Sequence, residues 1–140
     1  MAASVPKDPE WIVREVVLSV HEAQLAEHGG AWGIRDEGLL DSALMRPQNV
    51  FLYVPGATLY DVAAAYAIGI AKNHALFDGN KRTAWLACAL FLELNGIEVI
   101  ASEEDVVITI LGVASGSVDE QALSAWLQRA DVTRRDLFSG

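Results

Sequence analysis

The sequence is poor in the residues and segments that mark secreted and membrane proteins. Its 140 residues contain one cysteine, Cys88, which excludes an internal disulfide framework and a cysteine-rich zinc module. No apolar run reaches the roughly 20 residues that a membrane-spanning helix needs. Positions 1–10 lack the basic start and the apolar centre of a signal peptide. We therefore expect a soluble protein of a reducing compartment that does not bind a membrane.

Basic residues are also scarce. The chain has 10 Lys and Arg against 19 Asp and Glu, a net charge of −9. Binding to nucleic acid depends on neutralising phosphates with basic side chains, so no direct DNA binding is expected. Three of the ten basic residues nevertheless lie within eleven positions: Lys72, Lys81 and Arg82. This cluster indicates either a site for a small anion or phosphate-bearing ligand, or a solvated face.

Helical periodicity dominates the rest of the chain. Apolar residues recur at helical spacing, and no segment alternates as paired strands do. The expected helices span residues 8–28, 36–46, 58–73, 80–95, 102–115 and 117–130. Asp8-Pro9 is interpreted as the start of the first helix and Pro47 as lying just beyond the end of the second. Ser117 and Glu120 have the spacing of a capping box for the last helix.

Two of these helices are predicted to be buried. Residues 62–71 are all apolar or glycine, and residues 84–92 form a second, alanine-rich apolar stretch. A helix that is apolar on all sides is a buried helix, and alanine favours helix over strand. The expected fold is an all-α bundle of about six helices around a central buried helix hairpin. We expect one domain over 1–140, with a core over about 10–130 and a frayed tail over 131–140.

The loop between the two buried helices has the composition of an anion site. Residues 74–82 read His-Ala-Leu-Phe-Asp-Gly-Asn-Lys-Arg. A helix that starts near Asn80 directs free backbone N–H groups and its positive dipole end into the loop, and Gly79 permits close backbone approach. Phosphate is a common guest at such a helix start, and Lys81 and Arg82 add full positive charges.

Two further residues of the loop suggest catalysis. Asp78 would repel a phosphate directly, which indicates a divalent cation between them. Histidine is the side chain most often used for proton transfer near neutral pH, so His74 is able to accept a hydroxyl proton. The same loop also fits a simple turn with a helix cap, solvated cations and a histidine at a helix C-terminus. Residue types alone leave both interpretations open.

The nonapeptide 74–82 closely resembles the Fic/Doc signature, His-x-Phe-x-Asp/Glu-Gly/Ala-Asn-Gly/Lys-Arg. Six of its seven fixed positions match, and Leu76 replaces the usual phenylalanine. In this family that side chain anchors the loop in the core, a task that Leu76 and its neighbour Phe77 are expected to share. The resemblance continues through residues 21–48 and covers about residues 10–130. It implies a compact helical bundle around a central hairpin of helices.

The resemblance also implies a chemistry. Family members that transfer AMP usually carry a second glycine at the position of Lys81, whereas Doc-type members carry lysine. Doc-type members transfer the γ-phosphate of ATP to a threonine of elongation factor Tu, which stops translation. The resemblance therefore implies a Doc-like protein kinase toxin of the bacterial cytoplasm that uses ATP and Mg²⁺. The alternatives are an AMP transferase that acts on a protein hydroxyl and a catalytically silent nucleotide-binding module.

Residue roles follow from the family motif, position by position. His74 would be the general base for the target hydroxyl, and Asp78 would hold Mg²⁺. Phosphate would be bound by the backbone of one residue and the side chains of the next three: Gly79, Asn80, Lys81 and Arg82. Lys72, just before the motif, is a candidate phosphate contact or a solvated lysine. The residues assigned to catalysis are His74, Asp78 and Arg82.

Control is expected to come from a separate protein. Self-restraining Fic enzymes carry Ser/Thr-x-x-x-Glu-Gly/Asn, but the only glutamate here that precedes Gly or Asn is Glu37, with Gly33 four positions earlier. The resemblance therefore implies an antitoxin that docks a helix into an apolar groove. We expect the outer helices to form this groove, because the central pair is buried. Basic flanks are expected on the partner, because this chain is acidic.

Overall fold

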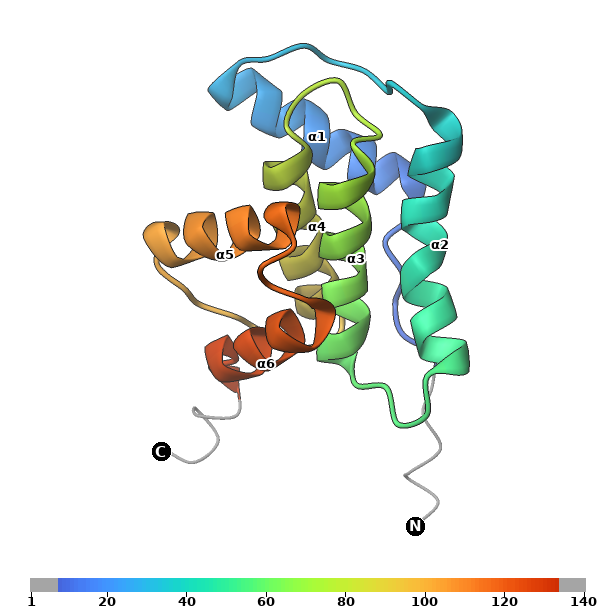
Figure 1. Cartoon of the computed structure of the whole chain (residues 1–140), viewed down its shortest axis with the longest axis vertical. Helices are drawn as coiled ribbons and strands as arrows, with labels where there is room; N and C mark the ends of the chain where they lie inside the picture. The colour runs from blue at the N-terminus through green and yellow to red at the C-terminus, as the bar shows by residue number, and fades with distance from the viewer. Residues whose placement is uncertain (1–7, 134–140) are drawn as a thin grey trace.

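The computed structural model describes residues 8–133, and this part of the chain forms six α-helices (Figure 1). The helices are α1 (Arg14–His28), α2 (Glu37–Tyr53), α3 (Leu59–Asn73), α4 (Asn80–Leu94), α5 (Glu103–Ser115) and α6 (Glu120–Ala130). Within the same residues, β pairing is limited to two isolated bridges, Ile34 with Leu76 and Val99 with Asp131. The predicted all-α class is confirmed. Between residues 8 and 133, no helix is long and apolar enough to cross a membrane.

Helix α3 lies at the centre of the bundle. Its residues from Val62 to Ala71 are all buried, and it contacts α2, α4, α5 and α6. In Figure 1, α2 runs alongside α3, and α4 packs against α3 after the loop of residues 74–79 that arches over the top of the bundle. Gly69 allows α2 to approach closely, because a Cβ at this position would lie 3.1 Å from the carbonyl oxygen of Ala43. The predicted central hairpin is therefore confirmed as α3 and α4.

The expected start of the first helix at Asp8-Pro9 is wrong, because α1 begins at Arg14. The preceding segment is held against the bundle by side chains instead of by helical bonds. Asn95 accepts a hydrogen bond from the Glu10 N–H at 2.8 Å and donates one to the Glu10 carbonyl at 3.0 Å. The Ile12 N–H donates to the hydroxyl of Tyr66 on α3 at 3.0 Å. These tertiary contacts keep the segment out of the helix.

The expected end of the second helix before Pro47 is also wrong. Helix α2 continues through Pro47 to Tyr53, although proline has no N–H to donate to the carbonyl of Ala43. Pro47 is buried, and Val50 and Phe51 beyond it pack against the core. The packing of Pro47, Val50 and Phe51 against the core offsets the lost helical hydrogen bond. The residues that pack against these side chains are distant along the chain. A proline in the local sequence therefore predicts a helix end that tertiary packing overrides.

The last helix starts later than its predicted capping box. Asp119 is the N-cap of α6, and its side chain accepts the Ala122 N–H at 2.8 Å. The hydroxyl of Ser117 instead donates to the Gly112 carbonyl at the end of α5, at 3.3 Å. Ser117 therefore closes the preceding helix and does not cap the next one.

The predicted frayed tail is wrong for its first three residues, and positions 134–140 lie outside the described residues. Asp131 is buried and accepts a hydrogen bond from the hydroxyl of Tyr60 at 2.5 Å. The Val132 N–H donates to the Glu98 carbonyl at 3.0 Å, and the hydroxyl of Thr133 accepts the Glu98 N–H at 2.8 Å. The chain after α6 is thus bound to the segment between α4 and α5.

Candidate anion-binding site at the start of helix α4

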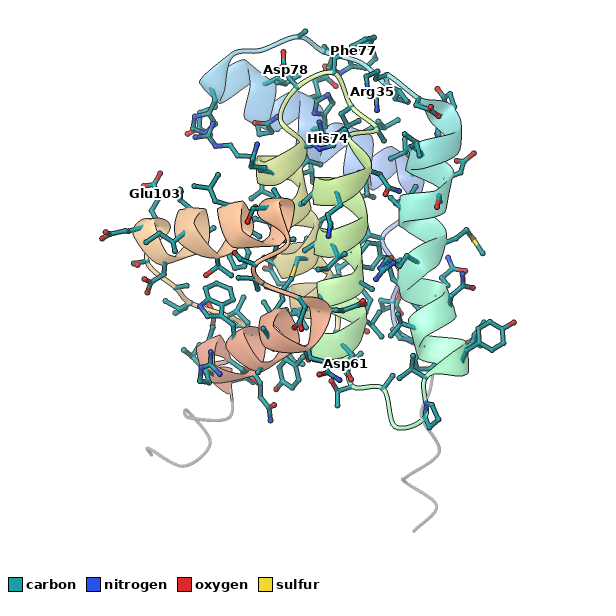
Figure 2. All side chains as sticks on the ribbon, viewed as in Figure 1. Arg35, Asp61, His74, Phe77, Asp78 and Glu103 are labelled. Atoms are coloured by element: carbon teal, nitrogen blue, oxygen red, sulfur yellow. The ribbon has the colours of Figure 1, made fainter. Side chains whose placement is uncertain are left out.

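The loop between α3 and α4 is fastened by the segment that precedes α2. His74 ends α3 in the left-handed conformation, with φ of 51°. The Arg35 Nε donates to the His74 carbonyl at 2.7 Å, and the Arg35 and Asp36 N–H groups both donate to the Ala75 carbonyl, at 2.7 and 3.1 Å. Figure 2 shows His74 and Arg35 at the same end of the bundle as Phe77 and Asp78. These bonds fix the start of the loop and the backbone of His74.

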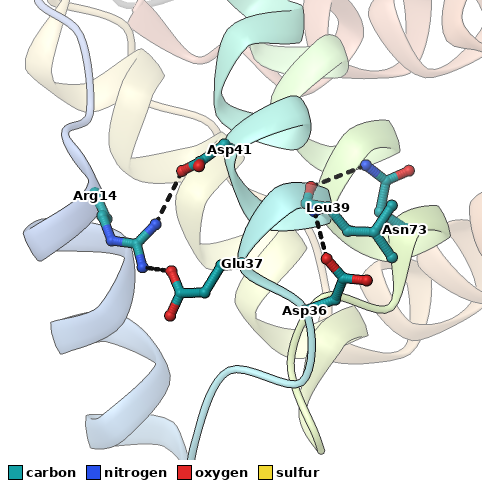
Figure 3. A network of polar contacts seen from close by, with 6 residues as sticks. All are labelled: Arg14, Asp36, Glu37, Leu39, Asp41 and Asn73. Atoms are coloured by element: carbon teal, nitrogen blue, oxygen red, sulfur yellow. Dashed lines mark hydrogen bonds and ion pairs between the residues drawn. The ribbon is translucent and has the colours of Figure 1, made fainter.

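Side chains also fasten this end of the bundle (Figure 3). Arg14 on α1 forms ion pairs with Glu37 and Asp41 on the first turns of α2, the latter at 3.0 Å. The Asn73 amide donates to the Leu39 carbonyl at 3.1 Å, which joins the end of α3 to α2. The contacts hold α1, α2 and α3 together where the loop emerges.

Leu76 anchors the middle of the loop. It is 1% exposed and forms a backbone bridge with Ile34. Phe77, by contrast, is 56% exposed, and its ring lies beside Gly33. The expectation that Phe77 shares the anchoring role is therefore wrong, because its ring is exposed while the Leu76 side chain is buried. Leucine fills the buried position alone.

Helix α4 begins without a side-chain cap. Gly79 is its N-cap, with φ of 76°, and the first turn contains no acidic residue. The first-turn N–H groups therefore have no capping side chain, and the dipole at this end attracts anions. A Cβ on residue 79 would collide with Gln24 Nε2 of α1, which explains why glycine stands here. The start of α4 is thus an open, positively polarised helix end.

The carboxylate of Asp78 is oriented by the glycine-rich loop after α1. Its Oδ2 accepts the Ala31 N–H at 2.7 Å, whereas Oδ1 has no hydrogen bond among residues 8–133. No group of three or more His, Cys, Asp or Glu side chains gathers there or elsewhere in the described residues. A bound cation would therefore meet one protein carboxylate here, with most of its coordination left to other ligands.

The residues 78–82, which the sequence assigns to metal and phosphate binding, line one cavity of about 370 Å³. Its walls are Gln24, His28, Gly29, Gly30, Asp78, Gly79, Asn80, Lys81 and Arg82. Lys81 and Arg82 are exposed and form no ion pair with any residue in the range 8–133. The structure thus brings together the predicted phosphate-binding residues 79–82 and the predicted metal ligand Asp78.

Two predicted site residues lie apart from this cavity. His74 is exposed at the opposite end of the same loop and does not line it. The Nζ of Lys72 lies 3.9 Å from where a Cβ on Gly116 would be, beside the turn between α5 and α6. The structure therefore does not bring Lys72 together with Lys81 and Arg82.

Sequence reasoning missed the contribution of α1. His21 and Gln24 are buried and lie one turn apart on the side of α1 that faces α4. His21 Nδ1 lies 3.5 Å from the hydroxyl of Thr83 on α4. Burial lowers the pKa of His21, and the Asp78 carboxylate opposes part of this effect. The signal in the sequence was that His21 and Gln24, two polar residues, lie at helical spacing on the same face of α1 as the apolar residues Val17 and Leu25.

A second cavity of about 980 Å³ runs beside the first, between α1, α4 and α5. Its apolar walls include Val20, Trp85, Leu86, Leu90, Val107, Ile110 and Leu111, and it also contains Glu27, Glu93 and Glu103. We call this cavity the α1–α4–α5 groove. The expectation that the central pair is wholly buried is wrong for α4, which exposes one edge to this groove, with Leu86 38% exposed.

Comparison with known proteins assigns the family. A sequence model of the Fic/DOC family matches residues 11–92. This range includes α1, the segment before α2 that contains Arg35 and Asp36, and the whole loop between α3 and α4. The chain therefore belongs to the Fic/DOC family. It is 46% identical to Toxin Doc of Mycolicibacterium smegmatis over 93 residues, which cover 66% of this chain and 69% of the relative. It is 32% identical to Protein kinase doc of Escherichia phage P1 over 115 residues, which cover 82% and 90%.

Proposed function

We propose that this protein is a Doc-like toxin, a protein kinase that transfers the γ-phosphate of ATP to a Thr or Ser hydroxyl of a translation factor. The observation that carries the proposal is the loop that joins His74 and Asp78 to an uncapped helix start flanked by Lys81 and Arg82. The relatives named Toxin Doc and Protein kinase doc support this activity. Elongation factor Tu, which the family resemblance implies, is the proposed target, and translation arrest the proposed result.

The cavity at the start of α4 is the proposed site for the phosphates of ATP. The helix end offers N–H groups without a capping side chain, and phosphates bind readily at such ends. Lys81 and Arg82 line the same cavity and are not neutralised by an acidic partner among residues 8–133. Phosphoryl transfer depends mainly on positioning and charge stabilisation, which these groups supply.

His74 is the proposed proton acceptor. Its backbone is held by Arg35, and its side chain is exposed where a target protein has access. In the proposed step, His74 takes the proton of the target hydroxyl while the hydroxyl oxygen bonds to the γ-phosphorus. The bond between that phosphorus and the β–γ bridging oxygen breaks, and ADP leaves with its electron pair.

Asp78 is the proposed Mg²⁺ ligand. Its Oδ2 is held by the Ala31 N–H, which leaves Oδ1 for a cation. Mg²⁺ usually takes one or two carboxylates and completes its shell with water and substrate phosphates, so a single carboxylate fits this mode. Bound here, Mg²⁺ would neutralise charge on the β- and γ-phosphates.

Labelled ATP tests the proposal. The purified protein is incubated with a bacterial lysate and with ATP labelled at either the α- or the γ-phosphate, alongside the His74→Ala variant. We expect protein labelling from the γ position only and none with the variant, with elongation factor Tu as the labelled band. Labelling from the α position would make the protein an AMP transferase, against which Lys81 argues. ATP binding without any labelling would make it a silent nucleotide-binding module.

A separate antitoxin is the proposed partner, and the α1–α4–α5 groove is its proposed binding site. The groove is mostly apolar, which suits the apolar face of an amphipathic helix. It carries Glu27, Glu93 and Glu103 as well as Lys81 and Arg82, so the basic flanks expected of the partner would meet the three glutamates. Co-expression with the product of the gene immediately upstream tests this. We expect that product to copurify with the wild type and with Leu52→Glu, an exposed apolar position on α2 outside the groove. Val107→Glu, inside the groove, should abolish copurification, and unchanged copurification would exclude the groove.

A further inference from the structure

Two buried nitrogen atoms on α1 have no hydrogen-bond partner. Among the described residues, His21 Nε2 and Gln24 Nε2 are buried side-chain nitrogens without a partner. Gln24 is 4% exposed as a whole residue. Buried polar groups are nearly always paired, because an unmade hydrogen bond leaves the full desolvation cost uncompensated. The amide of Gln24 therefore requires an explanation that internal packing does not provide.

The position of this amide suggests a ligand. Its nitrogen lies against Gly79, the uncapped start of α4, where a Cβ would collide with it. Gln24 also lines the cavity of about 370 Å³ at the start of α4, together with Lys81 and Arg82. We call this cavity the phosphate cavity. Rotation about the last torsion of glutamine, which is broad, exchanges the amide nitrogen and oxygen. The amide is therefore able to turn an N–H toward an anion in the cavity.

We propose that Gln24 contacts the nucleotide directly, as a neutral donor to a phosphate oxygen at the start of α4. The inference rests on the function proposed above, since it assigns a further residue to the same phosphate cavity. Three kinds of donor then meet there: the helix N-terminus, the cations of Lys81 and Arg82, and one side-chain amide from α1. Once the amide has turned, the bound phosphate is the partner that its N–H lacks within the protein, and the amide oxygen takes the position beside Gly79.

Two substitutions separate this role from simple packing. Gln24→Met keeps an unbranched side chain of similar length and removes both N–H groups, so it also removes the unpaired donor. Gln24→Glu keeps the shape but replaces the donor with acceptor oxygens. Gln128→Met, at an exposed position on α6 outside the cavity, is the matched control. If Gln24 only packs against Gly79, the Met variant should bind anions as the wild type does.

The experiment measures Kd for MgATP and for inorganic tripolyphosphate by calorimetry, together with the thermal unfolding midpoint. We expect Gln24→Met to raise both Kd values about tenfold, on the scale of one hydrogen bond to a charged group, without lowering the midpoint. Gln24→Glu should raise them at least as much, and Gln128→Met should change neither. The tripolyphosphate arm shows that the loss lies at the phosphates, because this probe has no base or ribose.

The outcomes distinguish this inference from the proposed function. Wild-type binding of MgATP with equal binding by Gln24→Met would overturn the role of Gln24 and leave the kinase proposal intact. Failure of the wild type to bind either probe would overturn the kinase proposal itself. If Gln24→Met does not fold, Gln24→Glu decides by the same comparison, and undiminished affinity in that variant would again overturn the inference.

Discussion

The amide of Asn80 is paired with the backbone of Leu76 on both sides. Its Oδ1 accepts the Leu76 N–H at 3.1 Å, and its Nδ2 donates to the Leu76 carbonyl at 2.9 Å. The first residue of α4 thereby closes the loop that carries His74 and Asp78. The second N–H of the Asn80 amide is not used in these two bonds and is left for a phosphate oxygen. The phosphate contact of Asn80 stays a prediction.

Removal of the Asn80–Leu76 hydrogen bonds should lower both the stability of the protein and its phosphate transfer. Asn80→Ala leaves the Leu76 N–H and carbonyl without their partner, so we expect a loss of about 1–2 kcal/mol in the free energy of unfolding and about a tenfold or larger loss of phosphate transfer. Denaturant unfolding and the labelled-ATP assay measure the two effects.

Asn95→Ala is the matched control, because Asn95 similarly pairs with both backbone groups of Glu10, far from the site along the chain. It should cost similar stability and leave transfer unchanged. Equal transfer rates in the two alanine variants would contradict the role of the Asn80 bridge.

Asp78→Ala should abolish transfer through loss of the metal. Asp78→Asn separates this effect from loop distortion, because the amide oxygen still accepts the Ala31 N–H while the negative charge is lost. We expect both variants to lose nearly all transfer, and EDTA to stop the wild type until Mg²⁺ is restored. Full activity of Asp78→Asn, or indifference of the wild type to EDTA, would remove the metal from the mechanism.

Arg82→Lys should not be a mild change. A guanidinium binds two phosphate oxygens in one plane, whereas an ammonium does not. The expected loss of transition-state stabilisation is about 1–3 kcal/mol, or roughly 5- to 150-fold in kcat/KM. Lys72→Ala is the control, because Lys72 lies outside the cavity and its loss should leave kcat/KM unchanged. Wild-type kinetics for Arg82→Lys would mean that Arg82 is not a phosphate ligand.

Buried His21 should make stability depend on pH. Its pKa in the folded protein is lowered by burial, only partly opposed by Asp78, whereas an unfolded histidine titrates near 6.5. Below about pH 6.5 the unfolded chain binds a proton that the folded chain does not, so the free energy of unfolding falls until the lowered pKa is passed. Above about pH 6.5 this histidine contributes no slope.

Denaturant unfolding between about pH 5 and 8 tests this expectation. His21→Asn should flatten the slope below about pH 6.5. Substitution of the exposed His28 by Gln should leave the slope in place. The same slope in His21→Asn as in the wild type would show that another group causes the pH dependence.

Local sequence was sufficient for the hairpin and its loop. The apolar stretch 62–71 is buried on every side, whereas the stretch 84–92 is buried along one face only, and both helices could be predicted from composition. The loop residues from His74 to Arg82 are contiguous, so their chemistry was visible as a motif. The buried position of Leu76 also agrees with the family pattern.

Tertiary contacts decided the rest. Pro47 remains inside α2 because the turns beyond it pack against the core, and Lys72 points to the α5–α6 turn. Gln24 meets Gly79 only because α1 packs on α4. No local pattern encodes these contacts, since each depends on residues distant along the chain.

The two cavities share a wall. Gln24, His28, Lys81 and Arg82 line both the phosphate cavity and the α1–α4–α5 groove. A partner seated in the groove would therefore touch side chains that are proposed to bind the nucleotide, and the two binding equilibria would then be linked. By reciprocity, the factor by which the partner changes the affinity for nucleotide equals the factor by which nucleotide changes the affinity for the partner. If both proposals hold, inhibition by the partner and occupancy by the nucleotide would be governed by a single coupling free energy.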